Sequence, residues 1–511
     1  MHNRSLAPLM ALGFACTLGW ASPSFAQTAP AAKEASKDAA PAPKRYELRG
    51  QARTPSGAFN YRAVAQETHL TDDKGKPLAA IFSTAYFRDG TFAPEDRPIA
   101  FIFNGGPGSA SVWLHLGVFG PKRVAVPSDA TDDGAAPYRL VDNPHTLLDV
   151  ADLVFIDPVG TGFSRTLGEE DPKKYFGVTQ DADYLARFIR KWLSENKRWN
   201  SPKYLAGESY GTTRVAALTR ALTGGWLDVA INGAMLISSI TDFQTARFAP
   251  GNDTPHIGFL PTFAATAWYH GKVDKSAWNG SLENFLADVR SFAVDDYATA
   301  LLMGSAQSAE ARRAVIAKLA RYSGLTEDYI EQTNLRISAQ RFFKQLLRDR
   351  GLTVGRLDSR YTGVDYDGAG ETPDNDPSAF GIDASYTAAM HDYLTRSFGV
   401  DIDRDYQILS GDPGRSWAWN VEGGQGWPAY VNVTPWLGEG MRQNKDMRVM
   451  LMSGYFDLAT PFFSAEISLQ RNGVPQDRLT RKYYEAGHMM YVHEPSLAQM
   501  AADARAFVTG K

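Results

Sequence analysis

The pattern of apolar and polar side chains begins with three short strands. They are expected at residues 46–52, 60–70 and 79–88 and are separated by the turn-forming stretches TPSG and DDKGKP. Short turns between strands favour antiparallel neighbours. We therefore expect the fold to start near Tyr46 with an antiparallel meander.

Further along, the pattern changes to runs that are apolar at almost every position. Such runs are typical of strands buried on both faces, as in a parallel sheet covered by helices. Between two of these runs, residues 179–196 place Tyr184, Phe188 and Trp192 on one face at helical spacing, which predicts a helix that packs on the core. The strands expected in this sheet are 98–104, 151–157, 202–209, 231–239, 448–457 and 478–488.

Residues 241–430 break this alternation. We expect an α/β fold in which a mostly parallel central sheet, flanked by helices, is built from residues 46–240 and 431–511, and residues 241–430 are inserted as a mainly helical cap. The insertion is helical in pattern at 308–321 and 336–350, polar and rich in Gly, Asp and Pro at 362–378, and rich in tryptophan at 417–436.

The first 26 residues have the layout of a secretory signal. Arg4 is followed by an apolar run from Leu6 to Trp20 and by the small-x-small sequence Ser24-Phe25-Ala26. A membrane anchor is the alternative, but glycines interrupt the run and a polar tail follows it. Residues 27–45 are rich in Ala, Pro and Lys and predict a flexible linker. We expect a secreted protein, with the periplasm as its destination and no membrane segment after signal removal.

Composition narrows the possible partners. The 511 residues carry a net charge of −4, which gives no basic field for nucleic acid. The single cysteine, Cys16, lies in the expected signal, so we expect no disulfide and no thiolate metal site in the mature chain. No histidine pair has zinc-helix spacing and no glycine loop ends in Gly-Lys-Ser/Thr, so neither a metal nor a cofactor is expected. A peptide or a small acyl compound is the expected substrate, and the sequence does not distinguish a monomer from a dimer.

The pentapeptide Gly207-Glu208-Ser209-Tyr210-Gly211 stands between a strand pattern and a helix pattern. A serine on such a sharp turn exposes its hydroxyl above the sheet, and small residues two positions away on either side let strand and helix approach closely. A plain turn with a capping serine is the alternative. The flanking patterns and a second glycine motif upstream favour Ser209 as a nucleophile.

Candidate partners for Ser209 follow the insertion. A serine hydroxyl needs a histidine to take its proton and a carboxylate to orient that histidine. In the order Ser, Asp, His the chain offers Asp457 and His488, each where an expected strand meets a loop. Asp457 is alternatively a turn carboxylate, and other histidines compete with His488. These rivals are His115, His256, His270 and His493.

The upstream motif, Asn104-Gly105-Gly106-Pro107-Gly108-Ser109-Ala110-Ser111, directly follows an expected strand. A glycine pair in this position leaves backbone N–H groups free to face a developing oxyanion. A plain glycine-rich turn is the alternative, and it is less common when the loop follows a buried strand ahead of a nucleophile turn.

Together these motifs resemble those of the serine carboxypeptidases, the acid-active branch of the α/β hydrolases. NGGPGSAS, DNPHTLLDVADLVFIDPVGTGFS, GESYG, SGYFDLATP and AGHMMYVHEP occur in the order seen in that family. The chain is thus similar to a secreted bacterial member, and the resemblance implies an enzyme that releases C-terminal residues from peptides through an acyl-enzyme. The implied catalytic residues are Ser209, Asp457 and His488, with the backbone N–H groups of Gly106 and Tyr210 as oxyanion hole. The implied groups that bind the substrate's terminal carboxylate are Asn104, Gly105 and Glu208.

Glu208 implies acid-favoured activity, because two carboxyl groups can share a hydrogen bond only when one is protonated. In the family a second glutamate follows the asparagine by fourteen residues, and Val118 stands there in this chain. This departure favours an alternative, an esterase or acyltransferase with the same triad. Two weaker alternatives are a binding protein without catalysis and an aminopeptidase, whose glycine loop carries a histidine where this chain has Asn104.

Overall fold

The structure is a computed structural model that describes residues 41–224, 227–421 and 430–510. The expected signal, most of the expected linker and part of the tryptophan-rich stretch 417–436 lie outside the described residues. The strands are β1 Arg45–Thr54, β2 Gly57–Thr71, β3 Pro77–Arg88, β4 Ile99–Phe103, β5 Lys122–Ala125, β6 Arg139–Asp142, β7 Asp152–Ile156, β8 Arg165–Thr166, β9 Lys203–Ser209, β10 Gly233–Ser239, β11 Thr353–Val354, β12 Thr362–Gly363, β13 Arg448–Gly454 and β14 Leu479–Tyr484.

The helices lie between these strands and in the insertion. They are α1 Val112–Leu114, α2 Val178–Glu195, α3 Tyr210–Thr223, α4 Thr254–Tyr269, α5 Leu282–Phe292, α6 Ala298–Met303, α7 Ala309–Ser323, α8 Glu327–Gln332, α9 Ala339–Gln345, α10 Pro377–Phe380, α11 Asp383–Asp392, α12 Gly411–Ser416, α13 Thr434–Gln443, α14 Phe462–Arg471 and α15 Glu494–Thr509. A π-helical turn, His115–Phe119, directly continues α1, and a short 3-10 turn, Met490–Val492, precedes α15.

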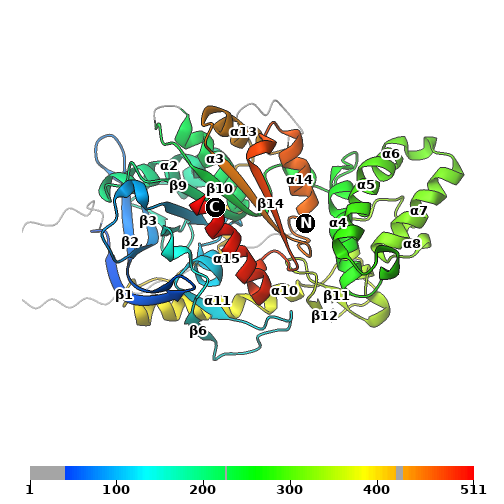
Figure 1. Cartoon of the computed structure of the whole chain (residues 1–511), viewed down its shortest axis with the longest axis horizontal. Helices are drawn as coiled ribbons and strands as arrows, with labels where there is room; N and C mark the ends of the chain where they lie inside the picture. The colour runs from blue at the N-terminus through cyan, green and yellow to red at the C-terminus, as the bar shows by residue number, and fades with distance from the viewer. Residues whose placement is uncertain (1–40, 225–226, 422–429, 511) are drawn as a thin grey trace, which may run out of the picture. The chain divides into compact units, whose positions relative to one another are not determined.

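One large sheet organises the described residues, with strand order β1-β2-β3-β7-β4-β9-β10-β13-β14 and β8 beside β3. The first three strands pair antiparallel, as the short turns between them predict. The six expected inner strands are confirmed, and from β7 to β14 they run parallel. The fold is therefore an α/β hydrolase sheet assembled from both ends of the sequence (Figure 1).

The two faces of the sheet bury separate apolar clusters. Along β4, Ile99, Phe101 and Phe103 belong to the cluster that also contains α2, α3 and α13. Ala100 and Ile102 belong to the opposite cluster, which contains α11 and α15. Successive side chains of a strand point to opposite faces, so a continuous apolar run serves both clusters.

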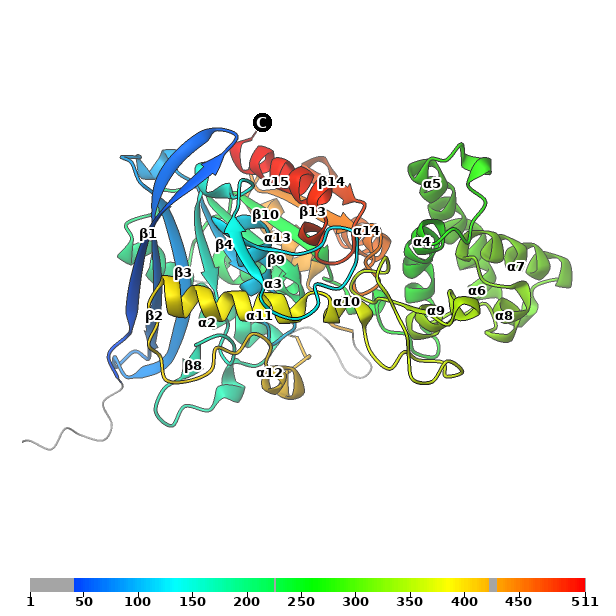
Figure 2. The same ribbon diagram turned by 90° about the horizontal axis from the view of Figure 1, so that it is seen from below.

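The segment expected as the insertion packs in two places. Helices α4 to α9 surround a third apolar cluster, which also includes Phe456 and Phe462 from the C-terminal part of the sheet domain. Helix α11 instead contributes Tyr386 and Met390 to the cluster under the sheet, and it lies along the sheet in Figure 2. Residues after 376 therefore return to the sheet.

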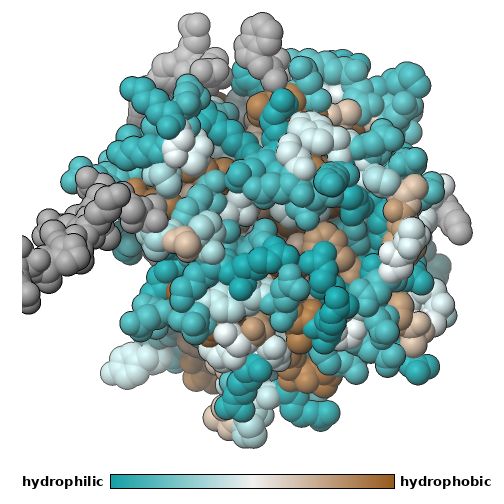
Figure 3. Space-filling view, turned by 90° about the vertical axis from the view of Figure 1, so that its left-hand side faces the viewer, coloured by the Kyte–Doolittle hydropathy of each residue, from teal (hydrophilic) through white to brown (hydrophobic). Residues whose placement is uncertain are grey.

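The face on the side of β1 and β2 is mostly hydrophilic, with scattered apolar side chains (Figure 3). β1 is one of the two edge strands of the sheet, and it carries Arg45, Glu47 and Arg49 at exposed positions. Charged side chains on an edge strand oppose pairing with a strand of another chain. Among the described residues, no helix is both long and apolar enough to cross a bilayer.

Candidate active site

Ser209 ends β9 at a sharp turn, and α3 begins at the next residue. Its backbone has φ 61° and ψ −129°, a conformation that costs an L residue about 1–3 kcal/mol. A Cβ on Gly207 would lie 2.1 Å from the carbonyl oxygen of Gly211, and one on Gly211 would lie 3.0 Å from that of Asn104. Both glycines are therefore required by close backbone contacts, and the half-buried Ser209 side chain lies at the strand's carboxyl end.

His488 and Asp457 meet beside the carboxyl ends of β13 and β14. The Nδ1 atom of His488 lies 2.9 Å from Oδ2 of Asp457, and both side chains are almost fully buried. Burial opposes charge on both groups, but the attraction between them holds the pKa of Asp457 below its usual value and raises the pKa of His488. An Nδ1–H that donates to Asp457 leaves Nε2 of His488 as the proton acceptor.

The sequence predicts a strand that ends at Asp457, but in the structure Asp457 lies three residues beyond the end of β13. β13 ends at Gly454, because the next residues leave the ladder to pair with the loop after β14. The backbone N–H of Phe456 donates to the carbonyl of Ala486 at 3.0 Å. Thr460 then fixes the carboxylate: its N–H donates to Oδ1 of Asp457 at 3.0 Å and its hydroxyl donates to Oδ2 at 2.8 Å.

A short segment of the insertion holds the histidine loop, and the sequence analysis missed it. Asp358 accepts the backbone N–H of Gly487 at 3.1 Å, while the N–H of His488 donates to the carbonyl of Leu357 at 2.6 Å. Arg360 forms a buried ion pair with Asp358 at 2.6 Å. The sequence signal was the closely spaced Asp358 and Arg360, but nothing in the pattern assigned them to a loop more than a hundred residues away.

The rival histidines have other partners. His115 is buried, with Nε2 2.6 Å from the Tyr86 hydroxyl, and burial lowers its pKa to about 3. His256 contacts a backbone carbonyl through Nδ1, His270 contacts another through Nε2, and His493 contacts the Ser496 hydroxyl. Of these histidines and His488, it is His488 that pairs with an aspartate at the end of the parallel strands.

The glycine loop packs directly on the nucleophile turn. A Cβ on Gly105 would lie 2.6 Å from the backbone nitrogen of Tyr210 and 2.9 Å from Cβ of Ser209. Gly106 has φ 101°, a conformation that favours glycine. The loop thus brings Gly105 next to the amide of Tyr210, with Gly106 as the following residue of the same loop.

A returning strap from the insertion holds this loop in place. The N–H of Ser410 donates to the carbonyl of Gly108 at 2.8 Å, and the N–H of Ala110 donates to the carbonyl of Ile408 at 3.0 Å. Buried Asp157 joins the same parts, because it accepts the N–H of Ser111 at 2.9 Å and the Tyr406 hydroxyl at 2.7 Å. The insertion therefore supports both the histidine loop and the glycine loop.

Asn104 and Glu208 form a buried pair beside Ser209. The Asn104 amide donates to Oε1 of Glu208 at 2.8 Å, and its own Oδ1 accepts the N–H of Leu114 at 3.0 Å. Burial raises the pKa of Glu208 to about 7, although the nearby His488 opposes the rise. Val118 is fully buried in the apolar cluster under the sheet, so it adds no second acid here.

Aromatic side chains stand next to the nucleophile turn. The Tyr210 ring makes edge contacts with Trp417 at 5.3 Å and with Trp419 at 5.9 Å between centroids. Phe243 contacts Trp419 in the same way at 5.0 Å. Trp419 is partly exposed, so the group offers an apolar surface on the side of Ser209 that faces α3.

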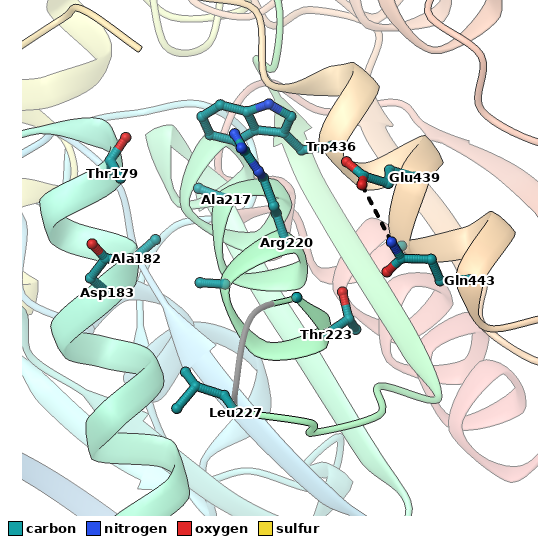
Figure 4. A pocket seen from close by; sticks show the side chains of 13 residues that line it. Thr179, Ala182, Asp183, Ala217, Arg220, Thr223, Leu227, Trp436, Glu439 and Gln443 are labelled. Carbon is teal, nitrogen blue, oxygen red and sulfur yellow. Dashed lines mark hydrogen bonds between the residues drawn. The ribbon is translucent and has the colours of Figure 1, made fainter. Parts of the chain in front are cut away.

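A cavity of about 590 Å³ lies between α2, α3 and α13, away from these residues. Figure 4 shows Arg220 over the ring of Trp436, at 4.6 Å from its centroid, and Glu439 facing Gln443. The cavity is lined by the C-terminal half of α3, whereas Ser209 precedes the first residue of that helix. The proposed chemistry therefore does not use it. Across the described ranges, no group of three or more His, Cys, Asp or Glu side chains is arranged to hold a metal.

Comparisons with known proteins agree with this geometry. The family model "Serine carboxypeptidase" matches residues 85–498. Serine carboxypeptidase-like 13 of Arabidopsis thaliana is 30% identical over 164 residues, which cover 32% of this chain and 37% of that protein. Pheromone-processing carboxypeptidase kex1 of Sclerotinia sclerotiorum is 32% identical over 140 residues, covering 27% of this chain and 20% of that one. The matched parts thus span well under two thirds of these relatives.

Among solved structures, the prohormone-processing carboxypeptidase Kex1(delta)p of Saccharomyces cerevisiae has a TM-score of 0.52 at 18% identity. The match covers 91% of this chain and 94% of that one. This likeness supports the α/β hydrolase fold. Because the family model extends over most of the sequence, including both glycine motifs and the histidine loop, the chain belongs to the serine carboxypeptidase family.

Proposed function

We propose that the protein is a serine-type carboxypeptidase that releases single C-terminal residues from peptides. The observation that carries the proposal is the buried Glu208, which is bonded to Asn104 and adjoins the half-buried Ser209. A protonatable carboxyl that is buried away from solvent at this position suits a substrate whose terminal carboxylate lies one residue beyond the scissile bond. Family membership supports the same reaction.

In the proposed mechanism, Nε2 of His488 takes the proton of the Ser209 hydroxyl as the oxygen attacks the scissile carbonyl carbon. The N–H groups of Gly106 and Tyr210 stabilise the resulting oxyanion. His488 then gives the proton to the leaving amine, the C–N bond breaks, and an acyl-enzyme remains on Ser209. Water, deprotonated by His488, attacks the ester and restores the free hydroxyl, while Asp457 stabilises the imidazolium in both steps.

Glu208 couples substrate binding to pH. With a pKa of about 7, its carboxyl is protonated below that pH and can donate to the substrate carboxylate. Above it, two carboxylates face each other and repel. Affinity for a free C-terminal carboxylate is therefore present in acid and is lost as pH rises through about 7.

Protonation of His488 limits activity at low pH. His488 acts as a base when neutral, and the charges of Asp457 and Glu208 both raise its pKa. Protonating Glu208 removes one of those charges, so the two groups titrate as a pair. Peptide turnover should consequently show a bell-shaped pH profile, with an acid limb from His488 and an alkaline limb from Glu208.

The decisive test compares an N-blocked dipeptide that has a free terminal carboxylate with its C-terminal amide between pH 4 and pH 8. We expect kcat/KM for the free acid to exceed that for the amide by about 100-fold or more at acidic pH. A site that hydrogen-bonds a particular substrate group discriminates strongly against an analogue without that group, because the buried polar groups of the site are then left unpaired. The preference should shrink as pH rises. Equal cleavage of both compounds at every pH would contradict carboxylate recognition.

Glu208→Gln should change the pH profile rather than abolish activity. Glutamine does not ionise, so we expect the alkaline limb for the free-acid peptide to disappear and activity at pH 8 to match or exceed that of the wild type. Hydrolysis of p-nitrophenyl acetate, which has no carboxylate, should change by less than about 3-fold, since Glu208 does not act on the reacting carbonyl.

The control for this variant is Glu485→Gln, which removes an exposed carboxylate three residues before His488. Its peptide profile should match that of the wild type. An alkaline limb that persists unchanged in Glu208→Gln would show that Glu208 does not recognise the substrate carboxylate.

A second candidate function, an esterase or acyltransferase with the same triad, is favoured by Val118. This buried valine takes the place of a carboxyl that would strengthen recognition of a terminal carboxylate. Equal turnover of free acid and amide, with faster turnover of simple esters, would favour this candidate.

The location proposed for the enzyme is outside the cytoplasm, in the bacterial periplasm. Support comes from the signal pattern in residues 1–26. Expression of the full chain, followed by fractionation and N-terminal sequencing, should give a periplasmic product that begins at Gln27. An uncleaved cytoplasmic product would contradict this location.

A further inference from the structure

The Glu208 carboxyl uses one of its two oxygens. Oε1 accepts the Asn104 amide at 2.8 Å, but Oε2 is buried and has no hydrogen-bond partner among the described residues. The hydroxyl of Tyr491 is likewise buried and, within the same described ranges, has no hydrogen bond of normal geometry. The phenol nevertheless interacts with both Glu208 and Asn104, which places it at the carboxylate site. Two unpaired polar groups thus lie together beside Ser209.

Leaving such groups unpaired is costly. A buried donor or acceptor without a partner costs about 1–3 kcal/mol of desolvation. Native proteins keep few of them, and a cluster of two at a candidate active site indicates a missing partner. A substrate carboxylate has two acceptor oxygens, so it can accept from the Tyr491 hydroxyl and from protonated Glu208 at once.

Tyr491 is held in place by its own 3-10 turn and by the π-helical turn His115–Phe119, which continues α1. It lies in the 3-10 turn Met490–Val492, three residues after His488. Its ring packs so closely on Gly117 that a Cβ there would lie 2.3 Å from Cδ2 of Tyr491. Gly117 immediately precedes Val118, the position of the second glutamate in the family. The Tyr491 ring therefore packs against the residue next to that position.

We propose that the Tyr491 hydroxyl is a specificity-determining donor for the substrate's terminal carboxylate, acting with Asn104 and Glu208 in place of a second carboxyl group. This inference rests on the proposed carboxypeptidase function.

A phenol in this role differs from a second glutamate in its pH behaviour. Burial holds the pKa of Tyr491 well above its ordinary value, so the hydroxyl donates throughout the working range. Carboxylate binding then depends on the protonation of a single acid, Glu208. In the pH profile for the free-acid peptide, the alkaline limb should accordingly have the slope expected for the loss of one proton rather than two.

The test is Tyr491→Phe, which removes the hydroxyl and keeps the ring. We expect KM for the free-acid dipeptide at pH 5.5 to rise about 10- to 50-fold, the loss of one hydrogen bond to a charged group, with kcat changed less than about 3-fold. Turnover of p-nitrophenyl acetate and the rate of Ser209 labelling by a fluorophosphonate should stay at wild-type values. The alkaline limb should move to higher pH, because the interaction of the phenol with Glu208 lowers the pKa of that carboxyl and the variant lacks it.

The matched control is Tyr484→Phe. Tyr484 is also a buried phenol near the C-terminus, but its hydroxyl donates to Asp503 at 2.9 Å, away from Glu208. This variant should leave KM for the free acid unchanged. Thermal unfolding of both variants shows whether either one is damaged structurally.

Two results would overturn the proposal. One is an unchanged KM for the free acid in Tyr491→Phe. The other is an equal loss with the free acid, the acetate ester and the fluorophosphonate, which would mean that Tyr491 merely supports the histidine loop. Failure of the proposed function is seen separately, because the wild type itself would then fail to prefer the free acid over the amide.

Discussion

Ser209→Ala is expected to lower peptide and ester turnover by roughly 10⁴- to 10⁶-fold, the loss typical of removing a serine nucleophile. The alanine occupies the same strained backbone and leaves every hydrogen bond of the His488 and Asp457 pair in place. The free energy of unfolding should therefore change by less than about 1 kcal/mol. The measurement is kcat/KM for the free-acid dipeptide and for p-nitrophenyl acetate, beside urea unfolding and fluorophosphonate labelling.

A suitable control is Ser468→Ala, which removes a buried serine hydroxyl bonded to a helix carbonyl in α14 at 2.8 Å. It should retain wild-type activity and full labelling. Turnover near the wild-type rate in Ser209→Ala would show that another residue is the nucleophile and would refute the whole triad assignment.

Arg214→Met is expected to cost about 3–5 kcal/mol of unfolding free energy, which is the usual penalty for leaving a buried charge unpaired. Arg214 in α3 donates to Asp181 in α2 at 2.6 Å, and neither side chain is exposed by more than 1%. The same guanidinium donates to the carbonyl of Asn104 at 2.6 Å. The substitution thus removes support from two helices and from the start of the glycine loop.

Urea unfolding measures this loss, and Lys191→Met provides the comparison. Lys191 lies on the same helix as Asp181 and forms an ion pair with Glu195 at 2.8 Å, but both of its members are more than 40% exposed. Removing it should cost less than about 1 kcal/mol. A loss below about 1 kcal/mol for Arg214→Met would mean that Asp181 is readily neutralised by protonation in place.

The sheet and the nucleophile turn could be predicted because their signals are local. The apolar runs at 98–104 and 202–209 reveal strands buried on both faces, and Gly207 and Gly211 reveal a close strand-to-helix approach. Asp457 and His488 could be chosen because chain order and strand ends restrict the candidates. Their pairing at 2.9 Å agrees with that choice.

The supporting shell could not be predicted in the same way. Asp358 reaches Gly487 across 129 positions of sequence, and no periodicity in a single chain encodes that contact. Helical spacing marks which face of a helix is apolar, but not which apolar surface it covers, so the packing of α11 under the sheet is a tertiary outcome. The sequence does not mark Tyr491 as a site residue, because an aromatic residue near the chain end is usually a core contact.

The sheet's assembly from both ends of the sequence also sets an order in time. The nucleophile turn leaves the ribosome early, whereas β13 and β14, which deliver Asp457 and His488, are made last. Roughly 280 residues separate Ser209 from His488, and at about 5–20 residues per second their synthesis takes roughly 15 to 60 seconds. Through that interval the growing chain carries a serine without its base. The proposed triad is therefore incomplete inside the cell that makes the chain until the last strands have joined the sheet.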